Sequence, residues 1–248
     1  MKTILFQGDS ITDAKRIRDD GTHMGSGYAL MTAGKIAVDF PGKYRIINRG
    51  ISGNRSVDLY ARIKSDIINL KPDYLSILIG VNDVWHELEA SNGVSAEKYE
   101  FIYDRIICEV KEALPQCCII ILEPFVLKGS ATIAYFEEFQ KETFLRGEIA
   151  KKLALKHNLA FVPLQEQLSK IDSLSSNGSV LVDGVHPTPA GHETISRELY
   201  KLYKTILEKN KRRRTNLRRY NFPSFIKPGE KDDRLLNCQL PPPQRKGV

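Results

Sequence analysis

Five short apolar runs alternate with segments of helical periodicity along the first 208 residues of this chain. The β-rich runs occupy residues 2–7, 44–50, 74–79, 117–122 and 159–163. Apolar residues at helical spacing occur at about 26–39, 55–70, 95–113, 135–157 and 189–208. Such alternation favours parallel strands connected by crossover helices, with helices on both faces of the sheet. We therefore predict an α/β fold, a three-layer α/β/α sandwich around a central, mainly parallel five-stranded sheet.

The positive charge is concentrated in the C-terminal segment. Residues 211–248 hold eleven Lys and Arg against three Asp and Glu, a net charge of +8. Residues 1–210 hold 26 against 27, a net charge of −1, and are long enough for one domain with a full core. We predict a catalytic domain over 1–210 and a basic, disordered tail over 211–248. The tail composition favours an appendage over an arm that contacts nucleic acid.

The chain shows no sign of a membrane segment or a metal site. Lys2 follows the initiating methionine directly into the first apolar run, which leaves no room for a signal peptide, and no apolar run is long enough to span a bilayer. The cysteines lack the spacing of a metal site and are Cys108, Cys117, Cys118 and Cys238. We predict a cytoplasmic protein that uses neither metal nor cofactor and does not bind membranes.

Two segments far apart in the sequence offer the groups that acyl transfer needs. Ser10 lies just past the first apolar run, at the strand end where open parallel sheets bind ligands. Asp183 and His186 are three residues apart, and Pro187 biases His186 toward an extended backbone. A hydroxyl, an imidazole and a carboxylate are the components of a catalytic triad. By themselves the two segments also fit a polar turn and the entrance to the last helix.

Two further strand ends carry candidate hydrogen-bond donors. Gly50 follows the second apolar run, and Asn82 follows the third. An ester hydrolase needs preorganised donors for the oxyanion, which the backbone N–H of Gly50 and the side-chain amide of Asn82 would supply. Without the other segments, these residues are simply typical of turns that end strands.

Together the four segments resemble the motifs of the GDSL, or SGNH, hydrolase family. The matching blocks are residues 8–12 (GDSIT), 48–54 (NRGISGN), 79–83 (IGVND) and 183–187 (DGVHP). The resemblance covers about residues 2–208 and implies the flavodoxin-like strand order. It also implies that Ser10 is the nucleophile, His186 the general base and Asp183 the residue that orients the imidazole. The backbone amides of Ser10 and Gly50 and the side chain of Asn82 would then form the oxyanion hole.

The substrate is predicted less directly. The segments 7–13 and 76–86 resemble the branch of the family linked to carbohydrate deacetylation, such as acetylxylan esterases, which implies short acyl groups on a small-molecule or carbohydrate ester. The predicted substrate-pocket residues are Trp85, His86, Tyr28 and Arg55. The alternatives are a broader thioesterase or lysophospholipase, and a catalytically silent binding module.

Overall fold

The computed structural model describes residues 1–174 and 180–219, with side chains as far as Lys209. Its centre is a five-stranded sheet in the order β2-β1-β3-β4-β5, and every neighbouring pair is parallel. This order confirms the predicted flavodoxin-like arrangement. The strands are β1 (Lys2–Gly8), β2 (Tyr44–Asn48), β3 (Tyr74–Leu78), β4 (Cys118–Leu122) and β5 (Ala160–Val162).

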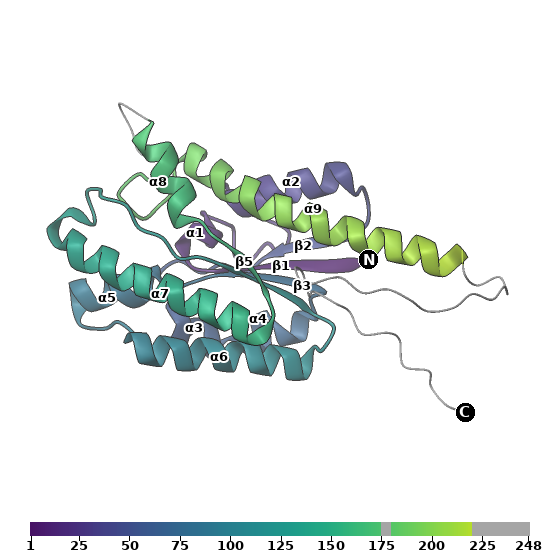
Figure 1. Ribbon diagram of the computed structural model, residues 1–248, viewed down its shortest axis with the longest axis horizontal. Coiled ribbons are helices and arrows are strands. Elements are labelled where there is room, and N and C mark those ends of the chain that lie inside the picture. The colour runs from purple at the N-terminus through teal and green to yellow at the C-terminus, as the bar shows by residue number, and fades with distance from the viewer. Residues whose placement is uncertain (175–179, 220–248) are drawn as a thin grey trace.

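Helices cover both faces of the sheet, as predicted (Figure 1). One face carries α2 (Tyr28–Asp39), α8 (Gln165–Ser173) and α9 (Pro189–Arg219). The other carries α3 (Ser56–Ala61), α4 (Ile63–Asp66), α6 (Ala96–Ala113) and α7 (Phe136–His157). Central strands such as β3 and β4 are buried along their whole length because both of their faces are covered. Each face of the sheet therefore has its own apolar core.

The structure contains elements that periodicity did not predict. These are α1 (Ser10–Asp13), α5 (Val81–Ala90), α8 and the 3₁₀ turn η2 (Ile133–Tyr135). The predicted helix over 55–70 is divided into α3, α4 and the 3₁₀ turn η1 (Ile68–Leu70). The first break is at Arg62, whose φ of −110° and ψ of 15° leave the helical region. The Arg62 guanidinium donates to the carbonyl groups of Arg49 and Gly8, so the break joins this segment to the loops after β1 and β2.

The last helix is longer than predicted. The pattern indicated an end at residue 208, whereas α9 continues to Arg219. Residues 211–219 of the predicted disordered tail are therefore helical, which fits the good helix propensity of their Lys, Arg and Leu residues. The rest of the predicted tail, 220–248, lies outside the described residues.

Among the described residues, no helix combines the length and the apolar composition that crossing a bilayer requires. The cytoplasmic location stays a prediction.

Candidate active site

The four sequence blocks meet at the carboxyl end of the sheet, next to its topological switch point. β1 lies between β2 and β3, so the connections that leave β1 and β3 diverge on opposite faces of the sheet. Ser10 begins α1 directly after β1, and Asn82 lies in the first turn of α5 after β3. The loop of residues 180–188 before α9 brings Asp183 and His186 to the same edge. The fold therefore assembles residues that are 176 positions apart.

Ser10, His186 and Asp183 form a continuous hydrogen-bonded chain. Ser10 Oγ lies 2.9 Å from His186 Nε2, and His186 Nδ1 lies 2.7 Å from Asp183 Oδ2. The other carboxylate oxygen, Asp183 Oδ1, accepts from the backbone amides of Val185 and His186 at 2.9 and 2.8 Å. Burial alone would raise the pKa of Asp183, but the hydrogen bonds from His186 and Val185 outweigh it and lower the pKa. An ionised Asp183 holds His186 Nδ1 as a donor and leaves Nε2 free to accept the serine proton.

The loop that carries Asp183 and His186 is held by a segment without any recognised motif. The backbone amides of Leu127 and Ala131 donate to the carbonyl groups of Gly184 and Asp183, each at 2.9 Å. Gly184 has a φ of 99°, and a Cβ there would lie 2.6 Å from both Leu127 O and Thr132 Oγ1. A Cβ on Gly129 would lie 2.3 Å from the Asp183 backbone. Segment 127–132 therefore positions the base and its carboxylate, a role that sequence analysis missed.

Ser10 lies at the start of a capped turn. Asp9 is the N-cap of α1, and its Oδ1 accepts from the Ile11 amide at 2.9 Å. The Ser10 amide has no hydrogen-bond partner among the described residues, as is usual for the first amides of a helix. Asp9 is fully buried, and its Oδ2 has no partner among the described residues. Burial raises the pKa of Asp9 to about 7, although the Ile11 amide and the charge of His186 act in the opposite direction.

Asn82 is buried with its amide fixed in place. Its side chain is 4% exposed, and Nδ2 donates to the carbonyl of Asn54 at 3.0 Å. A primary amide has two N–H donors, so one remains for a ligand. The neighbouring Asp83 accepts from the amide and hydroxyl of Ser56, which ties the start of α5 to the start of α3. Asn82 is thus held rigidly enough to serve as an oxyanion donor.

The structure argues against the predicted role of Gly50. Its amide donates to Asn48 Oδ1 at 2.8 Å and is therefore already used. A Cβ at this position would lie 2.3 Å from the Asp13 amide, so the glycine is needed for close packing against the turn after Ser10. Gly53, in the same loop, has a φ of 81°, open space where a Cβ would lie, and an amide with no partner among the described residues. Gly53 is the better candidate donor.

Two of the predicted pocket residues have partners outside the triad. Tyr28 is fully buried, packs edge-on against Phe6 and shares a hydrogen bond with Thr12 at 2.8 Å. It is a core residue because α2 lies directly on β1. The Arg55 guanidinium binds Asp58 and Asn92, so it connects α3 to the end of α5. The prediction of Tyr28 as a pocket residue is therefore corrected, and that of Arg55 stays a prediction.

Of the other two pocket predictions, Trp85 lies at the site. Its ring centroid is 5.7 Å from that of His186, and it also packs against Phe139. The indole Nε1 is buried without a hydrogen-bond partner among the described residues. His86 lies one residue further along α5, is half-buried, and makes no hydrogen bond to the triad within the described part of the chain.

A cavity of about 720 Å³ opens beside the triad. Ser10, Asp183 and His186 form part of its wall, together with the segment after α1 and the start of α9. His192 also lines it and accepts from the Tyr28 amide at 3.1 Å. Burial, reinforced by the charge of His186, lowers the pKa of His192 to about 4, so this imidazole is neutral at neutral pH. The nucleophile is therefore open to a small-molecule ligand.

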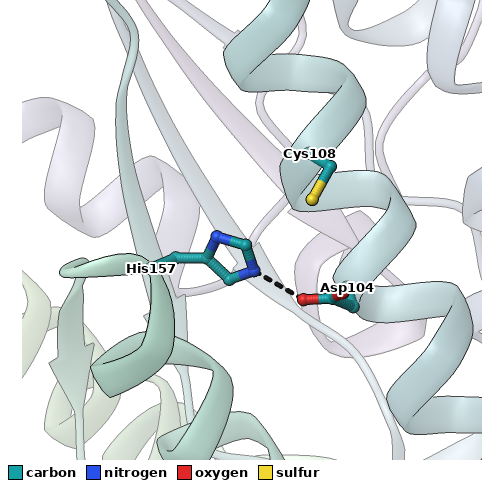
Figure 2. A group of neighbouring side chains, drawn as sticks. All are labelled: Asp104, Cys108 and His157. Carbon is teal, nitrogen blue, oxygen red and sulfur yellow. Dashed lines mark hydrogen bonds and ion pairs between the residues drawn. The ribbon is translucent and has the colours of Figure 1, made fainter.

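A second group of reactive side chains lies between α6 and α7 (Figure 2). Asp104, Cys108 and His157 place potential ligand atoms within 4.8 Å of one another. The Asp104 carboxylate already accepts from His157 Nε2 at 2.5 Å and from Lys156 Nζ at 2.9 Å. This ion-pair network connects the two helices and satisfies the carboxylate, so it has a structural role without an ion. The absence of a metal from the reaction stays a prediction.

Comparison with known proteins agrees with this geometry. The sequence profile of the GDSL-like lipase/acylhydrolase family matches residues 6–194. An acetylxylan esterase from Geobacillus stearothermophilus is 32% identical over 203 residues, which cover 78% of this chain and 90% of that protein. An uncharacterized lipoprotein of Bacillus subtilis is 25% identical over 176 residues, or 60% of this chain and 70% of that protein.

Solved structures show the same fold. A protein assigned as a GDSL-like lipase from Parabacteroides merdae has a TM-score of 0.74 at 36% identity, with 79% of this chain and 93% of that chain covered. The acetylxylan esterase of G. stearothermophilus has a TM-score of 0.71 at 32% identity, with 81% and 93% covered. Three structures of that esterase are described as catalytic mutants, of a serine, an aspartate and a histidine. Its aspartate and histidine are three residues apart, as are Asp183 and His186.

Proposed function

Because the chain belongs to the GDSL-like lipase/acylhydrolase family and is a carboxylic ester hydrolase, we propose that it removes acetyl groups from acetylated carbohydrates. The observation that carries the proposal is the continuous chain from Ser10 Oγ through His186 to Asp183, with distances of 2.9 and 2.7 Å. Similarity over most of the chain to an acetylxylan esterase supports acetyl as the acyl group and a sugar hydroxyl as the leaving alcohol.

In the proposed reaction, Ser10 Oγ attacks the ester carbonyl while its proton passes to His186 Nε2. The negative charge on the carbonyl oxygen is stabilised by the Ser10 amide and by the free N–H of Asn82 Nδ2. The third donor is the backbone amide of Gly53. It replaces the predicted Gly50 amide, which is bonded to Asn48. His186 then gives its proton to the alcohol oxygen, and the ester C–O bond breaks to leave acetyl-Ser10.

Hydrolysis of acetyl-Ser10 completes the cycle. Water enters where the sugar alcohol has left and loses a proton to His186 Nε2 as its oxygen attacks the acetyl carbonyl. Collapse of the second oxyanion releases acetate, and the proton returns from His186 to Ser10 Oγ. Asp183 stays ionised throughout, because three donors from Val185 and His186 stabilise its charge.

The proposal is tested with two substrate panels. The first is a series of p-nitrophenyl esters of increasing acyl length, and the second measures acetate released from acetylated xylo-oligosaccharides. We expect the highest kcat/KM for acetyl esters and release of acetate from the saccharide. A preference for long acyl chains or thioesters would instead indicate the thioesterase or lysophospholipase alternative.

The Ser10→Ala variant is the control for the nucleophile. We expect it to keep the circular dichroism spectrum of the wild type, to lose ester turnover and to lose labelling by a fluorophosphonate. Failure of the wild type to react with the fluorophosphonate would indicate a silent binding module. Turnover by Ser10→Ala at the wild-type rate would overturn the assignment of Ser10.

A further inference from the structure

The cavity beside the nucleophile has an excess of positive charge. Its charged lining residues are Lys15, Arg16 and Arg18 against Asp13 and Asp183, a net of +1. His192 adds no charge, because burial and the charge of His186 lower its pKa to about 4. Residues 1–210 as a whole carry a net charge of −1. The positive charge in the cavity is therefore local and does not follow from a generally basic domain.

Both carboxylate oxygens of Asp13 already accept hydrogen bonds. Asp13 accepts from Arg18 Nη2 at 2.9 Å and from the backbone amides of Arg16 and Ser52 at 3.0 Å. Its side chain is only 6% exposed, whereas that of Arg18 is 51% exposed and extends toward solvent. Asp13 thus anchors the segment after Ser10 and neutralises one of the three cations. The next two acidic residues, Asp19 and Asp20, are exposed and do not line the cavity.

Two of these cations form no ion pair with a carboxylate among the described residues. Arg16 is 8% exposed, and its Nε donates to the Gly50 carbonyl at 2.8 Å, but no acidic group among the described residues lies within ion-pair distance of it. Burial lowers the pKa of Arg16; the charge of Asp13 opposes this effect, whereas the charges of Arg49, Arg18 and Arg62 add to it. Lys15 is exposed at the cavity with a φ of 60° and likewise has no ion pair within the described part of the chain. A buried cation among other cations is stabilised when an anion binds beside it.

The position of these residues indicates which part of the ester meets them. Lys15, Arg16 and Arg18 follow α1 and line the same cavity as Ser10. In the function proposed above, the acyl group is acetyl, which carries no charge. An anionic group on the substrate must therefore belong to the alcohol part.

We propose that the preferred substrate is an O-acetylated acidic saccharide whose carboxylate binds at Lys15, Arg16 and Arg18. This inference rests on the proposed deacetylase function and assigns the class of sugar to it. A guanidinium matches the planar geometry of a carboxylate, and the Lys15 ammonium adds a mobile donor at the rim. Acetylated sugars without a carboxylate are then poorer substrates of the same site.

The test uses two substrates that differ in whether the sugar carries a carboxylate: an acetylated methyl glucoside and the corresponding acetylated methyl glucuronide. For the wild type, we expect kcat/KM to be about tenfold higher for the glucuronide at low salt, the order expected for charge-assisted contacts at a partly exposed site. The preference should fall toward unity at about 0.5 M salt, because exposed charges are then screened.

Matched variants locate the effect. Lys15→Gln should lower the ratio of the two kcat/KM values several-fold, whereas Lys43→Gln, which removes an exposed lysine at the opposite end of the sheet, should leave the ratio unchanged. Equal kcat/KM values for the two wild-type substrates, or a ratio that Lys15→Gln does not change, would overturn the inference and leave the deacetylase function standing. Absence of acetate release from both substrates would overturn the deacetylase function and the inference with it.

Discussion

Replacing Asp9 by asparagine should change how the stability of the protein depends on pH. Asp9 is 0% exposed and adjoins the nucleophile. Its Oδ1 accepts from the Ile11 amide, whereas Oδ2 is buried without a partner in the described part of the chain. Burial raises its pKa from 3.8 to about 7, and the negative charge of Asp83 adds to the increase. The folded protein therefore keeps a proton on Asp9 at pH values where the unfolded chain has lost it.

The sign and size of the effect follow from this difference. Below the unfolded pKa of 3.8, Asp9 is protonated in both states and contributes no pH dependence. Between that value and about 7, the folded state binds more protons, so its free energy of unfolding decreases as the pH rises. A shift of about three pH units corresponds to a loss of about 4 kcal/mol, which is complete above the folded pKa.

An asparagine side chain cannot ionise, so the Asp9→Asn variant should lack this loss. The new amide keeps an oxygen for Ile11 but places an N–H₂ group where Oδ2 has no partner, at a cost of about 1–3 kcal/mol that does not depend on pH. The diagnostic quantity is therefore the difference in stability between variant and wild type as a function of pH. We expect this difference to shift in favour of the variant by up to about 4 kcal/mol between about pH 4 and pH 8.

Urea unfolding at several pH values measures this difference, with circular dichroism and the fluorescence of the single tryptophan, Trp85, as probes. Asp20→Asn is the matched control, because the Asp20 carboxylate is exposed and its hydrogen bonds from Thr22 lower its pKa. Relative to the wild type, the Asp20→Asn control should gain no stability as the pH rises. Parallel curves of stability against pH for Asp9→Asn and the wild type would refute the reasoning, since they would mean that Asp9 ionises equally in both states.

Two substitutions at the site have expected effects on the rate. Asn82→Ala removes the fixed Nδ2 donor and should lower kcat about 10²–10³-fold for acetyl esters, with KM changed much less; an equal rate would exclude Asn82 from the oxyanion hole. Asp183→Asn keeps an acceptor for the Val185 and His186 amides but presents an N–H to His186 Nδ1, which forces the wrong tautomer. Steady-state assays should show a loss of about 10⁴-fold in kcat with an unchanged circular dichroism spectrum; a loss below about tenfold would contradict the role of Asp183.

The sequence predicted the strands because each depends on a short-range apolar pattern, whereas the sheet order and the roles of Ser10, Asp183 and His186 were implied by the resemblance to the GDSL family. Apolar runs such as 74–79 are buried on both faces and are easily recognised, and their carboxyl ends must meet at one edge. α5 was missed because it begins immediately after Gly80, inside a block that was interpreted for its chemistry alone. α9 was underestimated because apolar periodicity marks only the part of a helix that packs on the core.

The roles of single residues in loops were harder to predict, and the loop after β2 explains why. Gly50 and Gly53 are three residues apart in the same block, and their sequence context does not say which of the two amides already has a hydrogen-bond partner. The choice depends on Asn48, whose side chain accepts from Gly50, and on the packing of Gly50 against Asp13. Tyr28 was misplaced for a similar reason: its contacts with Phe6 and Thr12 exist only once α2 lies on β1.

The position of the Asp183 loop depends on a whole segment and not on a single residue. The triad distances depend on a backbone path through Gly184 that Leu127, Gly129 and Thr132 constrain from the connection between β4 and α7. A Cβ at Gly129 would lie 2.3 Å from the Asp183 backbone, so the path of the Asp183 loop requires a glycine at this position. It carries no chemical group, so a search for catalytic motifs passes over it. The precision of the site thus comes from close backbone packing between segments more than 50 residues apart.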